Sequence, residues 1–173
     1  SVQLRMKDSS DEDIIKAAKV LMPICHSSDV AFIINDSVEI AKKVGADGVH
    51  IGQEDLRYKE AREILGSNHI IGVTCHDSKH LAMSAGEQGA DYVAFGAFYP
   101  TTTKITTRVA TPELLNWWQD LFEIPCVAIG GINAENAASI ADAGADFLAI
   151  CSGVWDYPKG PRAAVKKLNQ LIK

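Results

Sequence analysis

Short apolar runs alternate with amphipathic stretches along nearly the whole chain. The apolar runs predict β-strands at 2–6, 30–35, 48–52, 69–74, 92–96, 126–131 and 147–151. The stretches between them predict helices at 11–22, 37–44, 57–65, 78–88, 111–120, 134–143 and 161–172. Strands that alternate with helices in this way indicate parallel strands joined by right-handed crossovers.

Residues that cap helices support several of these boundaries. Ser10 precedes an acidic turn at 11–13, and Thr111 precedes a proline at the first helical position. Asn133 is predicted to cap the helix that follows it.

The tripeptide Gly-Ala-Asp recurs three times in the same context. GADGVHIG at 45–52, GADYVAFG at 89–96 and GADFLAIC at 144–151 each follow a helical pattern and open an apolar run. Glycine after a helix favours the left-handed C-terminal cap. Gly-Ala-Asp is also common in ordinary loops, but three copies between a helix and a strand favour a repeated α–β unit.

Two α/β architectures agree with this alternation, an open doubly wound sheet and a (β/α)₈ barrel. A dinucleotide-binding sheet would carry GxGxxG after its first strand, and the sequence has none there. A barrel has short strands of similar length whose carboxyl ends carry polar residues, as here. We therefore predict a TIM barrel that forms a single domain over 1–173. Because a barrel has eight strands, we expect a first strand and helix of about 25–30 residues to be missing from this chain.

Composition excludes several classes of protein. The 173-residue chain has a net charge of −5 and no basic stripe, which argues against a nucleic-acid partner. No apolar stretch approaches a membrane span, and Ser1 leads straight into a strand pattern without a signal peptide. Cys126 and Cys151 are predicted to be small core residues, whereas Cys75 beside His76 leaves a reactive thiol open. Cysteines without a disulfide pattern favour the reducing cytoplasm.

Cationic and amide side chains follow the first predicted strand. Gln3, Arg5 and Lys7 are spaced by two, so they share one face of a strand. An exposed alternating strand would show the same pattern, but a parallel barrel strand has no solvated face. We therefore expect these side chains to line the mouth of the barrel.

Carboxylates follow the second and third strands. Asn35 and Asp36 end one strand, and Asp55 follows the next. Either aspartate alone is most simply interpreted as a helix cap. A barrel brings the carboxyl ends of its strands to one rim, so both would lie beside Arg5 and Lys7. Carboxylates are hard oxygen ligands for Mg²⁺, whose other positions are filled by substrate phosphates and water.

The later strands end in hydroxyls, glycines and a lysine. The fifth leads into Thr101, Thr103 and Lys104, the sixth into Gly130-Gly131, and the seventh into Cys151-Ser152. Such groups suit phosphate, because glycine exposes backbone N–H groups and the last barrel loops often bind phosphate. A threonine-rich surface loop is the alternative for 101–104.

These residues predict two anion sites on one rim, one cationic and metal-assisted and the other built of hydroxyls and glycine amides. Two phosphorylated small molecules that meet over a Mg²⁺-bound diphosphate indicate a transfer in which pyrophosphate leaves. Lys104 would serve between the two sites. His50 in the third strand and His76 after the fourth stay open between a structural role and a role at the site.

Six segments carry a resemblance to a known family. They are QLRMK at 3–7, IIND at 33–36, DGVHIGQEDL at 47–56, IIGVTCH at 70–76, GADYVAFGAFYPTTTK at 89–104 and CVAIGGI at 126–132. In this order they resemble thiamine-phosphate synthase, also called thiamine-phosphate pyrophosphorylase, over nearly the whole chain. The resemblance implies a (β/α)₈ barrel that joins hydroxymethylpyrimidine diphosphate to a thiazole phosphate. In that family pyrophosphate leaves first, and the thiazole nitrogen traps the resulting pyrimidine methylene cation.

The resemblance also implies a role for each matching residue. The pyrimidine diphosphate would be held by Gln3, Arg5, Lys7 and Asn35, and Mg²⁺ by Asp36 and Asp55. Thr74 stands where the family usually has serine and keeps the hydroxyl. The thiazole phosphate would be held by Thr101, Thr103, Gly131, Cys151 and Ser152. Catalysis would then depend on Arg5, Lys7 and Lys104, which together with Mg²⁺ offset the charge of the leaving group.

The sequence departs from the family pattern in three places, and two alternative functions remain open. The family's first strand and helix are absent, GAFYPT replaces the more usual glycine-proline, and ITTRVA after residue 104 is uncharacteristic. Thiazole tautomerases of the sister family share the barrel but need no diphosphate site, and a non-catalytic thiamine-phosphate sensor would keep the pocket. Trp117 and Trp118 on one helix favour core packing and leave a homo-oligomer contact open.

Overall fold

The computed structural model describes residues 1–101 and 108–172. The chain divides into two compact units. Unit 1 comprises Ser1–Thr74 and Glu87–Asp91, and unit 2 comprises Cys75–Gly86 and Tyr92–Lys173. Both units are built of parallel strands and helices, as the alternation in the sequence predicts.

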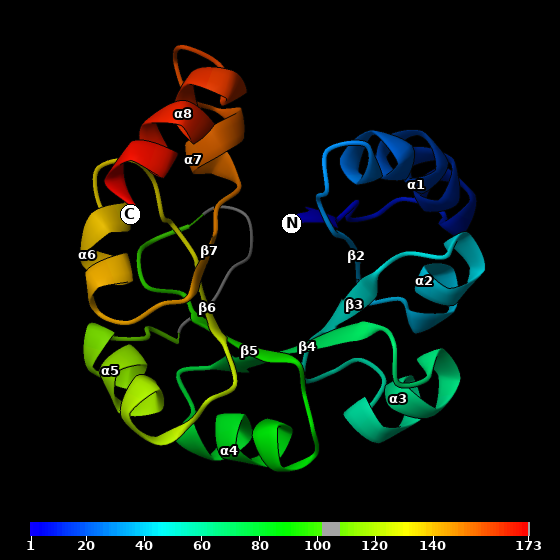
Figure 1. Ribbon diagram of the computed structural model, residues 1–173, viewed down its shortest axis with the longest axis horizontal. Coiled ribbons are helices and arrows are strands. Elements are labelled where there is room, and N and C mark those ends of the chain that lie inside the picture. Colours follow the sequence, from blue (N-terminus) through cyan, green and yellow to red (C-terminus); the bar gives the residue numbers. More distant parts are fainter. Residues whose placement is uncertain (102–107, 173) are drawn as a thin grey trace. The chain divides into compact units, whose positions relative to one another are not determined.

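Unit 1 carries a parallel sheet whose strands pair in chain order. Its three helices all lie on the same side of the strands (Figure 1). The elements are β1 (Val2–Leu4), α1 (Asp11–His26), β2 (Phe32–Asn35), α2 (Val38–Val44), β3 (Gly48–Ile51), α3 (Tyr58–Leu65) and β4 (Ile70–His76), the last two residues of β4 being counted with unit 2.

Unit 2 repeats the same arrangement. Strands β5, β6 and β7 pair in parallel and in chain order. The elements are α4 (Lys79–Glu87), β5 (Tyr92–Gly96), α5 (Pro112–Leu121), β6 (Cys126–Ile129), α6 (Ala137–Asp142), β7 (Phe147–Ala149), α7 (Ser152–Trp155) and α8 (Pro161–Leu171). The four-residue helix α7 is not predicted by the sequence.

The strand register divides the sheet of unit 1 into two faces. Leu4, Ile34, Val49 and Ile71 are lateral neighbours, so their side chains share one face. Three of the four, Ile34, Val49 and Ile71, are 0% exposed, as expected for the face that packs against the helices. On the opposite face Asn35 pairs with His50, and we call this the polar face.

The core of unit 2 forms around Trp118. This side chain is 0% exposed, stacks on Phe122 at 4.0 Å between ring centroids, and meets the edge of Phe95. Its indole N–H donates to the carbonyl of Ile124 at 2.7 Å, which satisfies the one polar atom of the ring. Core packing of Trp118 is therefore confirmed. Trp117 instead carries the ammonium of Lys79 at 4.4 Å from its ring centroid.

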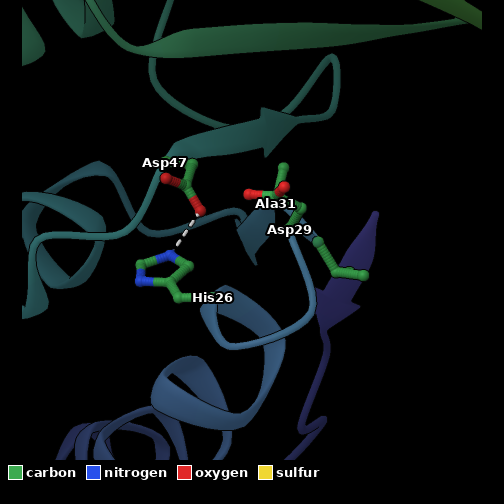
Figure 2. A pocket seen from close by; sticks show the side chains of 5 residues that line it. His26, Asp29, Ala31 and Asp47 are labelled. Atoms are coloured by element: carbon green, nitrogen blue, oxygen red, sulfur yellow. Dashed lines mark hydrogen bonds and ion pairs between the residues drawn. The ribbon is translucent and has the colours of Figure 1, made fainter.

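The aspartate of the first Gly-Ala-Asp copy joins three elements at the amino end of the sheet. The Asp47 carboxylate accepts the backbone N–H of Phe32, the first residue of β2, at 2.6 Å. The same oxygen contacts Nε2 of His26, in the last turn of α1, at 2.8 Å. Figure 2 shows this pair beside an open pocket that Asp29, Val30 and Ala31 also line.

The other two copies repeat this geometry with different partners. Asp91 accepts the N–H of Ile71 in β4 at 2.7 Å and the guanidinium of Arg62 in α3 at 2.5 Å. In unit 2, Asp146 accepts the N–H of Cys126 in β6 at 2.8 Å and the side-chain amide of Gln119 in α5 at 2.7 Å.

The Gly-Ala-Asp repeat in the sequence therefore corresponds to a repeated set of contacts, in which one aspartate binds both a strand and a helix; we call each set a clamp. We call Asp47, Asp91 and Asp146 the amino-end aspartates. Each immediately precedes a strand. Each also accepts the N–H of the first or second residue of the preceding strand and binds a side chain of the helix that leads into that preceding strand. A backbone N–H at the start of a strand has no partner within its own element, so the carboxylate satisfies it.

Several predicted boundaries are wrong by a few residues. The strands predicted to reach 6, 131 and 151 end at Leu4, Ile129 and Ala149, and α1 continues to His26 although Pro23 lies inside it. After β6 the chain leaves the sheet because Gly130 has φ +99°. Such a left-handed conformation does not continue a strand.

The predicted caps have mixed outcomes. Ser10 caps α1 by accepting the N–H of Asp13. Asn133 does not cap a helix: α6 begins three residues later than predicted, after Asn136, and the Asn133 side chain instead accepts the N–H of Glu135. Thr111 precedes α5 but makes no side-chain capping bond.

Candidate active site

The carboxyl end of β2 places Asn35 and Asp36 next to β3. Asn35 is level with His50 in the parallel ladder, and the N–H of Asp36 donates to the carbonyl of His50 at 2.8 Å. Asp36 then adopts φ +65°, a left-handed conformation that aspartate tolerates better than most residues. Ser37, not Asp36, caps α2, since its hydroxyl accepts the N–H of Ile40 at 3.2 Å. The interpretation of Asp36 as a helix cap is therefore wrong.

Asp55 lies in a tight turn at the carboxyl end of β3. Its carboxylate accepts the N–H of Gly52 at 2.6 Å, so the side chain folds back over the strand end. The next helix, α3, begins at Tyr58 with Arg57 at the N-cap position. Asp55 is consequently not a helix cap either.

Asp36 and Asp55 are therefore both bonded to residues at or just beyond the carboxyl end of β3. Asp36 is bonded through its backbone to His50 in β3, and Asp55 is bonded through its side chain to Gly52, the first residue after β3. Arg5 follows the end of β1, the strand that neighbours β2. The structure thus brings the cationic and acidic predictions of unit 1 to adjacent carboxyl ends of one sheet, as expected for parallel strands.

The shortness of β1 changes one argument from the sequence. The strand ends at Leu4, so the alternation of a strand no longer covers Lys7, which lies in a turn. Gln3 is level with Ile33, which places it on the polar face. The side chains of Gln3, Arg5 and Lys7 are exposed. The prediction that strand pleating places all three on one face is therefore wrong for Arg5 and Lys7, both of which lie beyond the end of β1.

From the sequence, His50 could have either a structural role or a role at the site. The structure places His50 on the polar face of the sheet. Its side chain is 7% exposed, and Nε2 lies 2.7 Å from the hydroxyl oxygen of Thr74 in β4. The amide of Gln53 donates to the backbone carbonyl of Thr74 at 2.5 Å. His50 stands two residues after Gly48 in a strand, and only the register shows that this period-two position faces Thr74.

Glycines bring the strand-end loops of unit 2 against one another. A Cβ on Gly131 would lie 2.5 Å from the carbonyl oxygen of Pro100, which adjoins Thr101. A Cβ on Gly153 would lie 2.5 Å from the carbonyl oxygen of Ile132. The loops after β5, β6 and β7 are therefore in backbone contact, and only glycine permits this approach.

Ser152 and Cys151 stand at the last of these loops. Ser152 opens α7 and adjoins Gly153, so it lies beside the loop after β6. Cys151 precedes this helix as an exposed free cysteine, and its prediction as a small core residue is wrong. The strand β7 ends two residues earlier than predicted, which takes Cys151 out of the sheet.

The remaining predictions have varied outcomes. Thr103 and Lys104 lie outside the described residues. Cys75 is 0% exposed, and burial raises the pKa of its thiol to about 12, so the reactive thiol that the sequence left open is excluded by its environment. Cys126 is buried, which confirms its prediction as a core residue.

The donor set fits a magnesium ion that takes few protein ligands. Within residues 1–101 and 108–172, no cluster of three or more histidine, cysteine, aspartate or glutamate side chains is arranged to hold a metal ion. Asp36 and Asp55 follow the carboxyl ends of the neighbouring strands β2 and β3. Mg²⁺ is commonly bound by one or two carboxylates together with substrate phosphates and water, so these residues suit the ion.

A family model described as thiamine monophosphate synthase matches residues 1–154. The chain belongs to this thiamine monophosphate synthase family. Members carrying the name thiamine-phosphate synthase include a protein of Rhodospirillum centenum, 58% identical over 172 residues, which cover 99% of this chain and 83% of that protein. A second, from Erythrobacter litoralis, is 52% identical over 98% of this chain and 80% of its own length.

A solved structure shares the fold of this chain. Thiamine phosphate pyrophosphorylase from Pyrococcus furiosus superposes with a TM-score of 0.90 at 34% identity, covering 98% of this chain and 81% of that one. Family membership makes the chain an enzyme, a transferase of thiamine biosynthesis, and confirms the resemblance found in the sequence. None of the helices in the described part of the chain is long and apolar enough to cross a bilayer.

Proposed function

We propose that this chain joins hydroxymethylpyrimidine diphosphate to thiazole phosphate, giving thiamine phosphate and pyrophosphate in a Mg²⁺-dependent reaction. The observation that carries the proposal is the gathering of Arg5, Asn35, Asp36 and Asp55 at adjacent carboxyl ends of β1, β2 and β3. Cations beside carboxylates at one rim suit a metal-bound diphosphate.

The diphosphate half is assigned to unit 1. Gln3 and Asn35 position the pyrimidine diphosphate by hydrogen bonds, and Arg5 and Lys7 bind its phosphate oxygens. Asp36 and Asp55 hold Mg²⁺. The bound ion supplies charge neutralisation to the diphosphate oxygens. Thr74 contributes a hydroxyl from the polar face.

The thiazole phosphate half is assigned to unit 2. Its binding groups are the hydroxyls of Thr101 and Thr103, the backbone of Gly131, and the Cys151-Ser152 turn. The support is that the loops carrying Gly131 and Ser152 touch through glycine contacts. Backbone N–H groups in such loops can surround a phosphate.

The reaction is dissociative. The carbon–oxygen bond to the diphosphate breaks first, and the pyrimidine methylene becomes a cation. The thiazole nitrogen then donates its electron pair to that carbon. Arg5, Lys7 and Lys104 offset the negative charge that develops on the leaving group, which lowers the barrier to the first step. No protein nucleophile is needed, because the chain's task is charge stabilisation and positioning.

We further propose that residues 1–173 form one domain of a (β/α)₈ barrel, to which an additional strand and helix contribute the eighth unit. The support is the similarity to the Pyrococcus furiosus structure, of which 81% is matched. Free cysteines accord with a cytoplasmic location, and a homo-oligomer is compatible with the aromatic side chains of α5.

The test is turnover by the full chain with both substrates, with and without Mg²⁺. We expect stoichiometric thiamine phosphate and pyrophosphate, and no product when the metal is chelated. Binding of thiamine phosphate without turnover would indicate a sensor instead. Isomerisation of the thiazole that ignores both the diphosphate and Mg²⁺ would indicate a tautomerase of the sister family.

A further inference from the structure

We propose that Gln53 is a positioning residue that fixes the Thr74 hydroxyl and couples it to the turn that carries Asp55. The inference rests on the proposed function, in which Thr74 and Asp55 belong to the site. It assigns to Gln53 a task that acts through Thr74 and involves no contact with substrate.

Thr74 is held at two points by residues of the preceding strand and its turn. The hydroxyl oxygen lies 2.7 Å from Nε2 of His50, and the backbone carbonyl accepts the Gln53 amide at 2.5 Å. Two contacts on opposite sides of one Cα restrict both the backbone and χ1 of Thr74. The direction of its hydroxyl is thereby set.

The β3–β4 ladder explains why Thr74 is held by a side chain. The last pair of this ladder is Ile51 with Val73, so Thr74 lies one residue beyond it. At this point β3 has turned away at Gly52. The side chain of Gln53 reaches back to β4 and extends the hydrogen bonding between the two strand ends by one residue.

The same turn carries the proposed metal ligand. Gln53 lies inside the turn that the bond from Gly52 N–H to the Asp55 carboxylate closes at 2.6 Å. A displacement of this turn therefore moves the carboxylate of Asp55 and the donor on Thr74 together. Gln53 links the metal side of the site to the polar face of the sheet.

Because the Gln53 side chain is exposed, the effect of its replacement on catalysis can be distinguished from an effect on the stability of the fold. The residue is exposed, whereas His50 is 7% exposed. A hydrogen bond in contact with water contributes little to folding, on the order of 1 kcal/mol or less. A change of Gln53 should thus leave the melting temperature nearly unchanged and still alter catalysis, where small displacements are costly.

Gln53→Glu is the decisive variant, because it keeps the shape and removes the amide donor. We expect kcat for pyrophosphate release to fall about tenfold, which corresponds to one hydrogen bond of roughly 1.4 kcal/mol. The KM for thiazole phosphate should not change. Gln170→Glu, an exposed change on α8 with the same alteration of charge, serves as the matched control and should keep full activity.

A double-mutant cycle with Thr74→Val tests whether Gln53 acts through the hydroxyl. If it does, Gln53→Glu costs nothing further once Thr74 is valine. An equal tenfold loss in both backgrounds overturns the inference.

A second readout does not depend on turnover. The ring ¹⁵N resonances of His50, measured by NMR on the full chain, should shift in Gln53→Glu and stay in place in Gln170→Glu. Unchanged resonances in both variants overturn the inference. If the wild-type chain makes no product, the proposed function fails, and the His50 resonances alone decide the positioning role.

Discussion

The two ends of the sheets use aspartate in opposite ways. At the amino ends, Asp47, Asp91 and Asp146 each bind a backbone N–H of the preceding strand and a side chain of a helix. At the carboxyl ends, Asp36 and Asp55 lie in turns beside the end of β3, where the proposed substrate binds. The carboxylates at the amino ends link strands to helices, and those at the carboxyl ends belong to the proposed metal site.

The comparison teaches that partner geometry, not residue type, separates structure from function here. Both sets lie within a few residues of an apolar run in the sequence. The amino-end aspartates satisfy donors that a strand leaves at its start. The carboxyl-end aspartates stand where parallel strands of an α/β protein present their ligand site.

The largest expected effect separates the two sets by activity. Asp36→Ala or Asp55→Ala should lower Mg²⁺-dependent pyrophosphate release by about 10²–10³-fold, because each removes a ligand from the ion that neutralises the leaving group. Both variants should remain folded with a modest loss of stability, about 1 kcal/mol each, from the left-handed backbone at residue 36 and the lost bond to Gly52 N–H at residue 55. Glu54→Ala, which removes a neighbouring exposed carboxylate from the same turn, should remain active. Unchanged release in both aspartate variants would remove them as metal ligands.

In unit 2, the loops at the carboxyl ends of the strands carry glycine. We expect replacement of Gly131 to lower the free energy of unfolding. Gly131→Ala adds a Cβ that would lie 2.5 Å from the carbonyl oxygen of Pro100, at φ +65°. We expect a loss of about 2–5 kcal/mol in the free energy of unfolding, from left-handed backbone plus overpacking, and a raised KM for thiazole phosphate. Gly160→Ala has φ +80° with no atom within 4 Å of the new Cβ, so it should show only the backbone part. Equal losses in the two variants would contradict the close approach of the loops.

An amino-end aspartate should affect stability and spare chemistry. Asp91→Ala leaves the N–H of Ile71 and the guanidinium of Arg62 without this carboxylate. Urea unfolding should show a loss of about 1–3 kcal/mol, while kcat per folded molecule stays within a factor of two or so. Asp120→Ala, an exposed change on α5, is the control and should alter neither quantity. A specific loss of kcat at full stability in Asp91→Ala would break the comparison.

Acid should weaken the first clamp in a defined range of pH. Burial alone would raise the pKa of Asp47, but the N–H of Phe32 and the hydrogen bond and charge of His26 together lower it below its usual value of 3.8. A carboxyl group with a lowered pKa in the folded state contributes stability above pH 3.8, and this is lost as the pH falls through the folded pKa. Unfolding of the wild type should therefore depend more steeply on pH below about 4 than unfolding of Asp47→Asn. Identical slopes would exclude this contribution.

The smallest expected effect concerns the helix partner of the same clamp. His26→Gln gives the first clamp the amide donor that Gln119 supplies to Asp146 in unit 2. Because the amide can still donate, we expect a change of about 0.5 kcal/mol or less in the free energy of unfolding at pH 7. His26→Ala removes the donor and should cost more than His26→Gln in the same urea titration. A larger loss for the glutamine variant would show that the three clamps are not equivalent.

The sequence by itself determined the alternation of strands and helices, the parallel pairing and the membership of the family. These features follow from local periodicity and from motifs that are contiguous in the chain, such as IIND at 33–36. The same reasoning located the carboxyl-end residues, because parallel strands fix which end of each apolar run gathers with its neighbours.

Tertiary structure alone decided which side chains contact one another. The amino-end aspartates bind helix residues 21 to 29 positions before them, as His26 to Asp47 and Arg62 to Asp91 show. His50 meets Thr74 only through the strand register, and Cys151 leaves the core because β7 ends early at Ala149. Periodicity sets which face a side chain takes within its own element. Its contacts depend on how separate elements are packed, and no local pattern in the chain records that packing.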